Sequence, residues 1–155
     1  MVFTMNKCNL KKTDSYIDFI KIVTGGKITY SSNPLDEMEI ISSGVMFNDA
    51  ILFRQSLHWN VTLLAEATGI SVKAIERHQK SNKPFNLSTS QSMLELAKLS
   101  LFGVSYFYNV NRWNYWLSTP HIQFDGHKPF SVINTIRGRE LIKRTIRGLE
   151  QGFSA

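Results

Sequence analysis

The chain has 155 residues, of which 43% are hydrophobic and 12% aromatic, and it carries a formal net charge of +6. This composition supplies enough apolar surface for a buried core and excludes a globally disordered chain. No apolar run approaches the ~20 residues of a membrane-spanning helix, which excludes a transmembrane protein. The single cysteine, Cys8, cannot form an internal disulfide, and the N-terminus shows no secretory signal. We therefore expect a cytoplasmic location and no association with a membrane.

The positive charge is concentrated in a few segments. Residues 71–83 carry four lysine or arginine residues against one glutamate, and residues 137–147 carry five against one. Basic clusters of this kind favour a polyanion or an acidic protein surface as the partner. A solvated face of a helix gives the same pattern, so both interpretations remain open at this point.

The N-terminal third predicts short helices. Thr13 or Asp14 can cap a helix over residues 14–24, and Gly25-Gly26 can end it. We expect residues 1–38 to form a poorly defined arm that tolerates deletion better than the rest of the chain. The helical pattern then continues with apolar residues three to four apart (Leu35, Met38, Ile41 and Val45) and a second helix over residues 47–56.

Residues 60–80 have the pattern of a helix-turn-helix. Asn60 can cap a helix over residues 61–68, Gly69 can form the turn, and Ser71 can cap a second helix over residues 72–80. In such a unit the second helix lies in the major groove of DNA. The candidate DNA-binding residues are Ser71, Lys73, Arg77 and Lys80. The alternative is a plain helical hairpin with a basic outer face.

The second half of the chain predicts three further helices and no convincing sheet. Ser88 and Gln91 form a capping-box pattern for an almost entirely apolar helix over residues 89–107, which should be the buried centre of the fold. A helix over residues 111–118 follows, then a loop shaped by Gly126 and Pro129. An amphipathic helix entered at Gly138 and ended at Gly148 or Gly152 completes the chain. The expected fold is all-α.

No arrangement of residues indicates catalysis. His121 and His127 flank a loop without the further ligands that zinc requires, and neither a nucleophile elbow nor a phosphate-binding glycine loop is present. We therefore expect a protein that is not an enzyme and that has neither a metal site nor a cofactor. Arg139, Lys143 and Arg147 are spaced four apart, which predicts one basic stripe on the last helix. A solvated face and a partner surface explain that stripe equally well.

Several spaced landmarks resemble the Xre antitoxins of RES–Xre toxin–antitoxin pairs, and in the last third the toxin-binding module of MbcA/ParS/Xre-type antitoxins. They are Trp116-Leu117-x-Thr119-Pro120, Gly126-x-x-Pro129, Thr135-x-x-Gly138 and Leu149-Glu150-x-Gly152, preceded by Ile40-Ile41-Ser42-Ser43-Gly44 and Leu87-Ser88. The similarity covers residues 39–152. It departs from the family pattern at Ser131, where the family often has an acidic residue.

The resemblance implies an all-helical antitoxin that dimerises through its N-terminal part and binds operator DNA to repress its own operon. It further implies that a C-terminal module covers the active site of a RES-type toxin, an enzyme that consumes NAD. The domains would be an arm (1–38), a helix-turn-helix and dimerisation region (39–98) and an antitoxin domain (99–155). The residues expected to build or present the toxin-binding face are Trp116, His121, Gly126, Pro129, Arg139, Lys143 and Arg147. The alternative is a helix-turn-helix transcription regulator without a toxin partner.

Overall fold

The computed structural model describes residues 17–152, and within this range it contains helices and no strand. This confirms the all-α prediction. The helices are α1 (Phe19–Val23), α2 (Pro34–Ser43), α3 (Phe47–Ser56), α4 (Val61–Thr68), α5 (Val72–Ser81), α6 (Leu87–Phe107), α7 (Val110–Leu117) and α8 (Ile136–Glu150), with the 3-10 helices η1 (Ile122–Phe124) and η2 (Pro129–Val132). None of the described helices is long and apolar enough to cross a membrane.

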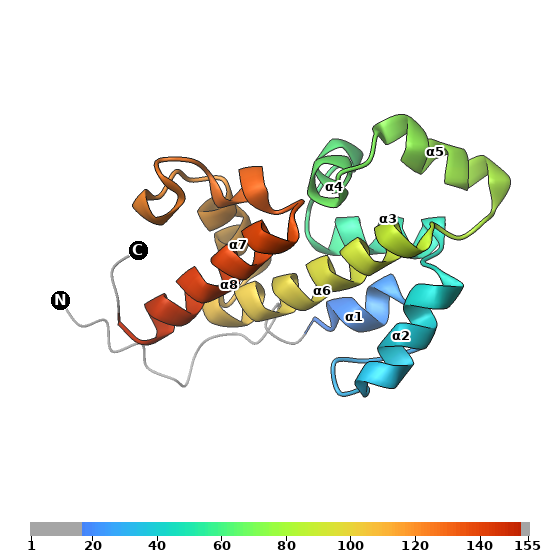
Figure 1. Cartoon of the computed structure of the whole chain (residues 1–155), viewed down its shortest axis with the longest axis horizontal. Helices are drawn as coiled ribbons and strands as arrows, with labels where there is room; N and C mark the ends of the chain where they lie inside the picture. The colour runs from blue at the N-terminus through green and yellow to red at the C-terminus, as the bar shows by residue number, and fades with distance from the viewer. Residues whose placement is uncertain (1–16, 153–155) are drawn as a thin grey trace.

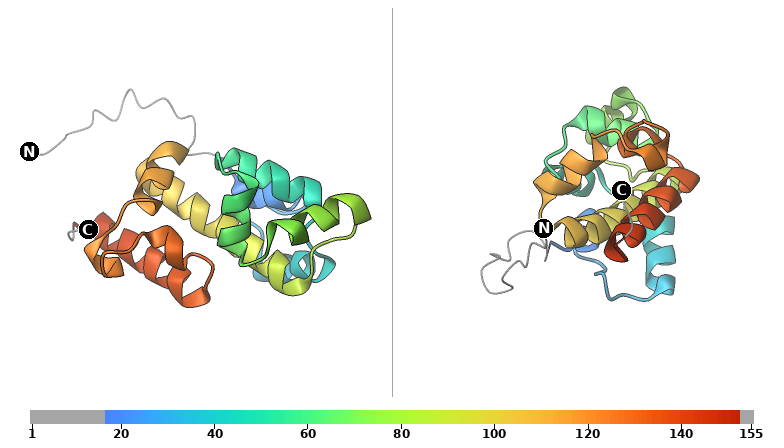
Figure 2. Two further views of the ribbon diagram at one scale, coloured as in Figure 1. Left: turned by 90° about the horizontal axis from the view of Figure 1, so that it is seen from above. Right: turned by 90° about the vertical axis from the view of Figure 1, so that its left-hand side faces the viewer.

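Helix α6 is the centre of the fold, as its apolar sequence predicts. It runs through the molecule and contacts α1, α2, α4, α7 and α8 (Figures 1 and 2). It begins two residues earlier than expected, because the side chain of Asn86 accepts a hydrogen bond from the Thr89 amide at 2.9 Å. The predicted cap, Ser88, is exposed, and Gln91 donates to Glu95 within the helix. The capping-box pattern therefore located the start of the helix but named the wrong residue.

Helix α1 is part of the core, which differs from the expected poorly defined arm. Phe19 and Val23 are fully buried, and the Phe19 ring meets Phe53 of α3 edge to face at 6.4 Å. The helix starts at Phe19 because Asp18 accepts a hydrogen bond from the Lys21 amide at 3.0 Å. The caps predicted at Thr13 and Asp14 lie outside the described residues. Since α1 packs against both α3 and α6, its deletion should not be tolerated.

Helix α2 forms where the apolar spacing predicts it, but it buries a different residue. Ile40 is buried and Val45 follows it into the core, whereas Leu35 and Met38 are 74% and 61% exposed. Periodicity locates a helix but does not by itself decide which apolar residues face the core. The exposed pair leaves an apolar patch on the outer face of α2.

Two close approaches that require glycine pack the C-terminal part, one between α6 and α7 and the other between α8 and η2. A Cβ atom at Gly103 of α6 would lie 2.4 Å from the Trp113 ring of α7, and one at Gly138 of α8 would lie 1.7 Å from the Val132 carbonyl oxygen. Helix α8 begins at Ile136, two residues before the expected start, because Thr135 caps it. Gly148 lies within α8, and the chain turns at Gly152, where φ is +82°.

The burial of α1 leads to a stability prediction. Phe19→Ala removes a fully buried ring, and we expect it to lower the free energy of unfolding by about 3–5 kcal/mol. Tyr115→Ala removes an aromatic side chain that is 73% exposed and should change this free energy by about 0.5 kcal/mol or less. Urea unfolding followed by circular dichroism measures both. Equal effects of the two substitutions would contradict the placement of α1 in the core.

Candidate functional site

Helices α4 and α5 form a compact pair whose turn is set by local hydrogen bonds. Asn60 accepts from the Leu63 amide at 2.8 Å and starts α4, and Gly69 ends it in the left-handed region with φ +75° and ψ +22°. Ser71 then accepts from the Ala74 amide at 3.1 Å and starts α5. All three positions were predicted from the sequence. Ile75 is the fully buried side chain of α5 and faces the side on which α3 and α4 pack.

The remaining face of α5 is open to solvent and basic. Ser71, Lys73, Arg77 and Lys80 are all exposed. Among the residues that the structure describes, Lys73, Arg77 and Lys80 make no ion pair, so their charges are available to a polyanion. Helix α5 lies at one end of the molecule, where a long ligand can approach it without meeting α7 or α8 (Figure 1). We call these four residues the α5 surface.

The expected toxin-binding residues include two that support the fold. Trp116 is 6% exposed and lies between Trp113 at 5.9 Å and the His121 ring at 5.1 Å, in stacked arrangements. Pro129 is buried at the start of η2. Neither side chain offers a surface to a partner, so both act by holding the C-terminal part together.

His121 and Gly126 shape the loop that joins α7 to η2. Gly126 has φ +78°, and its amide donates to the His121 carbonyl at 3.0 Å. The His121 amide donates to the His127 carbonyl at 3.2 Å, which closes the loop around η1. The loop presents Ile122 to solvent, since its side chain is 82% exposed.

The four-residue spacing predicted that Arg139 shares an exposed stripe with Lys143 and Arg147, and this prediction is wrong for Arg139. It is buried, and its guanidinium donates from Nε and Nη2 to the Glu95 carboxylate at 3.1 and 2.8 Å. Its Nη1 donates to the Ile133 carbonyl at 3.0 Å. Residue 139 lies three and seven positions before the buried Ile142 and Ile146, so it falls on the side of α8 that faces α6. The side chain ties α8 to α6 and to the segment before it.

Lys143 and Arg147 remain exposed, and both lie over an aromatic ring. The Lys143 ammonium and the Arg147 guanidinium are 5.7 and 5.9 Å from the centre of the Phe102 ring of α6. Cations at this distance interact with the ring face, which holds the two side chains side by side. We call Lys143 and Arg147 the α8 surface.

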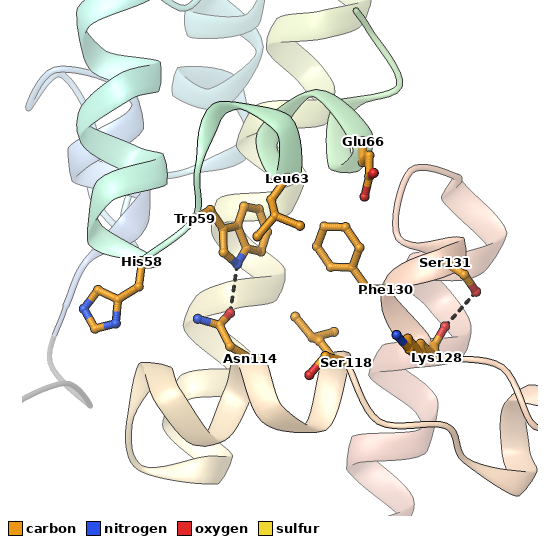
Figure 3. Close-up of a pocket in the computed structure, with 10 residues that line it drawn as sticks. His58, Trp59, Leu63, Glu66, Asn114, Ser118, Lys128, Phe130 and Ser131 are labelled. Atoms are coloured by element: carbon orange, nitrogen blue, oxygen red, sulfur yellow. Dashed lines mark hydrogen bonds between the residues drawn. The ribbon is translucent and has the colours of Figure 1, made fainter. Parts of the chain in front are cut away.

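A network around Trp59 joins the α4–α5 pair to the C-terminal part, and the sequence analysis missed it. The Trp59 indole donates to the Asn114 side chain at 2.8 Å (Figure 3). The Asn114 amide in turn donates to the Leu57 carbonyl at 2.8 Å. The Trp59 ring also meets Phe130 of η2 edge to face at 5.6 Å. The only local signal was a tryptophan directly before the Asn60 cap, and its partners lie more than fifty residues away.

The described residues contain no group of three or more His, Cys, Asp or Glu side chains placed to hold a metal ion. The His121 and His127 rings, which the sequence brought to attention, each meet a backbone carbonyl. His121 Nε2 lies 3.0 Å from the Trp116 oxygen, and His127 Nδ1 lies 3.2 Å from the Phe124 oxygen. Both rings are therefore engaged in the structure of the loop.

Comparison with known proteins assigns the C-terminal part. Residues 103–152 match the family model of the antitoxin Xre/MbcA/ParS C-terminal toxin-binding domain. The chain is also similar to the Prs ADP-ribosylating antitoxin of Sphingobium sp. (strain YBL2), with 23% identity over 138 residues. That similarity covers 83% of this chain and 87% of the relative, so it extends well beyond the C-terminal domain.

The different environments of Arg139 and Lys143 can be tested by equivalent substitutions one turn apart. Arg139→Met removes the ion pair with Glu95 and the hydrogen bond to the Ile133 carbonyl, and leaves the Glu95 carboxylate with only the hydrogen bond from Gln91. We expect a loss of about 2–3 kcal/mol in the free energy of unfolding. Lys143→Met removes an exposed cation and should cost about 0.5 kcal/mol or less. Urea denaturation of the two variants compares them directly. A loss at Lys143 as large as that at Arg139 would rule out the buried contact as the cause.

Proposed function

We propose that this chain is an antitoxin of the Xre/MbcA/ParS type, that it neutralises a RES-type, NAD-consuming toxin, and that it represses its own operon by binding operator DNA. The observation that carries the proposal is the toxin-binding domain over residues 103–152. The name of the Sphingobium relative connects an antitoxin with ADP-ribosylation. ADP-ribosyl transfer uses NAD as the donor, which agrees with an NAD-consuming partner. An antitoxin family indicates a binding role rather than a catalytic one.

The toxin would contact the outer side of the C-terminal domain. Trp116, Pro129 and Arg139 are buried, so they would act by fixing α7, η2 and α8 in place. Lys143 and Arg147 are exposed and held together over Phe102, which supports a direct contact with an acidic cleft. His121 and Gly126 would shape the loop that borders this face. Inhibition would be steric and electrostatic, without a covalent step.

Operator DNA would bind to the α5 surface. Lys73, Arg77 and Lys80 would supply phosphate contacts, and Arg77 has the donor geometry to read a guanine edge. Ser71 lies at the start of α5, where the residues of a recognition helix reach base edges. The exposed Glu76 lies among these cations and lowers the local positive charge.

The homodimer that the resemblance implies would place a second copy on the apolar patch of α2. Leu35 and Met38 lie one turn apart and are exposed, and along the long axis of the molecule α2 lies towards the right of Figure 1 whereas α8 lies towards the left. A dimer through this patch would leave both proposed binding surfaces open. Sedimentation velocity of the chain measures the association, and a monomer at micromolar concentration would contradict it. The proposed location is the cytoplasm.

The toxin contact can be tested by charge reversal on the α8 surface. Lys143→Glu with Arg147→Glu should reduce co-purification with the product of the adjacent toxin gene by at least about tenfold, because like charges would face an acidic cleft. The variant should unfold like the wild type, since both side chains are exposed. Its affinity for operator DNA should stay within about twofold if the two surfaces act separately. Retained toxin binding would place the toxin elsewhere on the domain.

The DNA contact can be tested by removing two cations from the α5 surface. Lys73→Ala with Arg77→Ala should weaken operator binding by about 1–3 kcal/mol for each base contact and reduce the slope of affinity against salt by about 1 for each phosphate contact. Toxin neutralisation should not change. Lys21→Ala with Lys27→Ala removes the same charge from two exposed residues of another region and serves as the control. A gel shift over a salt series compares them, and equal losses in both variants would indicate a general charge effect.

A further inference from the structure

The proposed function leaves without a role an apolar cavity between α4, with the residues just before it, and the C-terminal domain. Its volume is about 480 Å³, within the range of about 300–1,000 Å³ that is usual for small-molecule sites. Trp59 and Leu63 line one side, and Leu117 and Phe130 line the other (Figure 3). Each half of the molecule therefore supplies half of the wall.

The wall is preformed, because its largest member is fixed in place. Trp59 is 3% exposed, and its ring is held by the hydrogen bond to Asn114 and by the edge-to-face contact with Phe130. A cavity that is rigid before binding does not have to order side chains when a ligand enters. Phe130 is only partly buried, so its ring favours a flat aromatic ligand, which can lie against it.

The uncharged polar side chains Asn114, Ser118 and Ser131 of the wall are already engaged, so the part of the cavity that they line offers water few hydrogen-bond partners. The Asn114 amide is paired at both ends. Ser118 donates to the Tyr115 carbonyl at 3.1 Å, and Ser131 donates to the Lys128 carbonyl at 2.7 Å. Water in such a space has few partners, and an apolar ligand that displaces it gains affinity.

The charged side chains at the rim of the cavity determine where a charged group of the ligand would lie. Lys128 is exposed and makes no ion pair among the residues that the structure describes, so its ammonium is available. The Glu66 carboxylate belongs to the opposite wall, on α4, and disfavours an anion there (Figure 3). His58 is exposed, and its ring points away from the cavity towards Asn111, at 3.1 Å from that side chain. An anionic group would therefore lie at the Lys128 end.

We propose that this cavity is a binding site for a small aromatic carboxylate, with the ring against Leu63 and Phe130, beside the Trp59 indole, and the carboxylate at Lys128. The ligand would contact α4 and η2 at once and would add a bridge between the DNA-binding and toxin-binding parts. This site does not depend on the identity of the toxin or of the operator, and it holds even if the proposed function fails.

Three probes of one shape and different charge test the proposal on the full chain: indole-3-acetate, indole and tryptamine. Nitrogen-15 NMR reports the indole N–H signals of Trp59, Trp113 and Trp116, with the Trp59 signal assigned by Trp59→Phe. We expect indole-3-acetate to bind most tightly and to move the Trp59 signal, while the signals of Trp113 and Trp116, two buried residues of α7, stay in place.

Two variants locate the ligand. Lys128→Met should weaken indole-3-acetate binding about tenfold and leave indole binding unchanged, because only the anionic probe uses the ammonium. As the control, Lys83→Met removes an exposed lysine of the α5–α6 connection and should change the binding of neither indole-3-acetate nor indole. Leu63→Trp fills the cavity and should abolish the binding of all three probes.

Two results would overturn the proposal. An unmoved Trp59 signal at millimolar indole-3-acetate would mean that the cavity takes no such ligand. Equal affinity for the three probes, with no effect of Lys128→Met, would remove the carboxylate preference. If Leu63→Trp instead impairs toxin binding while no probe binds, the cavity receives a side chain of the toxin.

Discussion

The structure depends on the burial of α6, which no single partner could cover. A helix this apolar cannot remain in water, and it has 21 residues. Helices α1, α2 and α4 cover it from the N-terminal side of the chain, and α7 and α8 from the C-terminal side. The two binding surfaces of the proposed function are therefore attached to one continuous helix. A change that loosens α6 should affect both.

Helices α7 and α8 lie close to α6 because Gly103 has no side chain to block α7 and Glu95 balances the charge of Arg139 on α8. Gly103 allows the Trp113 ring to lie against the helix backbone, and no side chain larger than hydrogen fits there. Glu95 then supplies the charge that allows Arg139 to be buried. An unpaired guanidinium at this position would be costly, so the pair makes the approach of α8 specific rather than merely apolar. The same contact explains why a strongly basic helix can pack on the core.

Local signals in the sequence predicted the helices well, and signals that depend on distant partners failed. The bounds of α3 and α4 agree with the residues expected, and those of α4 were predictable because Asn60 and Gly69 act on their own neighbours. Spacing placed Arg139 in an exposed stripe, but its partner Glu95 lies 44 positions earlier, and periodicity contains no information about that distance. The Trp59–Asn114 contact was missed for the same reason. The helix pair α4–α5 was thus predictable, whereas the way it joins the C-terminal domain was not.

The junction at Trp59 gives the two surfaces a second connection besides α6. Leu57, Trp59 and Asn114 link the start of α4 to α7 by hydrogen bonds, and Phe130 adds η2 to the same contact. Helix α5 packs directly on α4, and η2 packs directly on α8. A shift of η2 on partner binding would therefore press on the wall that α4 shares with it, close to the turn at Gly69 that orients α5. Any coupling between toxin binding and DNA binding within one chain would have its shortest route here, because α6 itself is too well packed to move without cost.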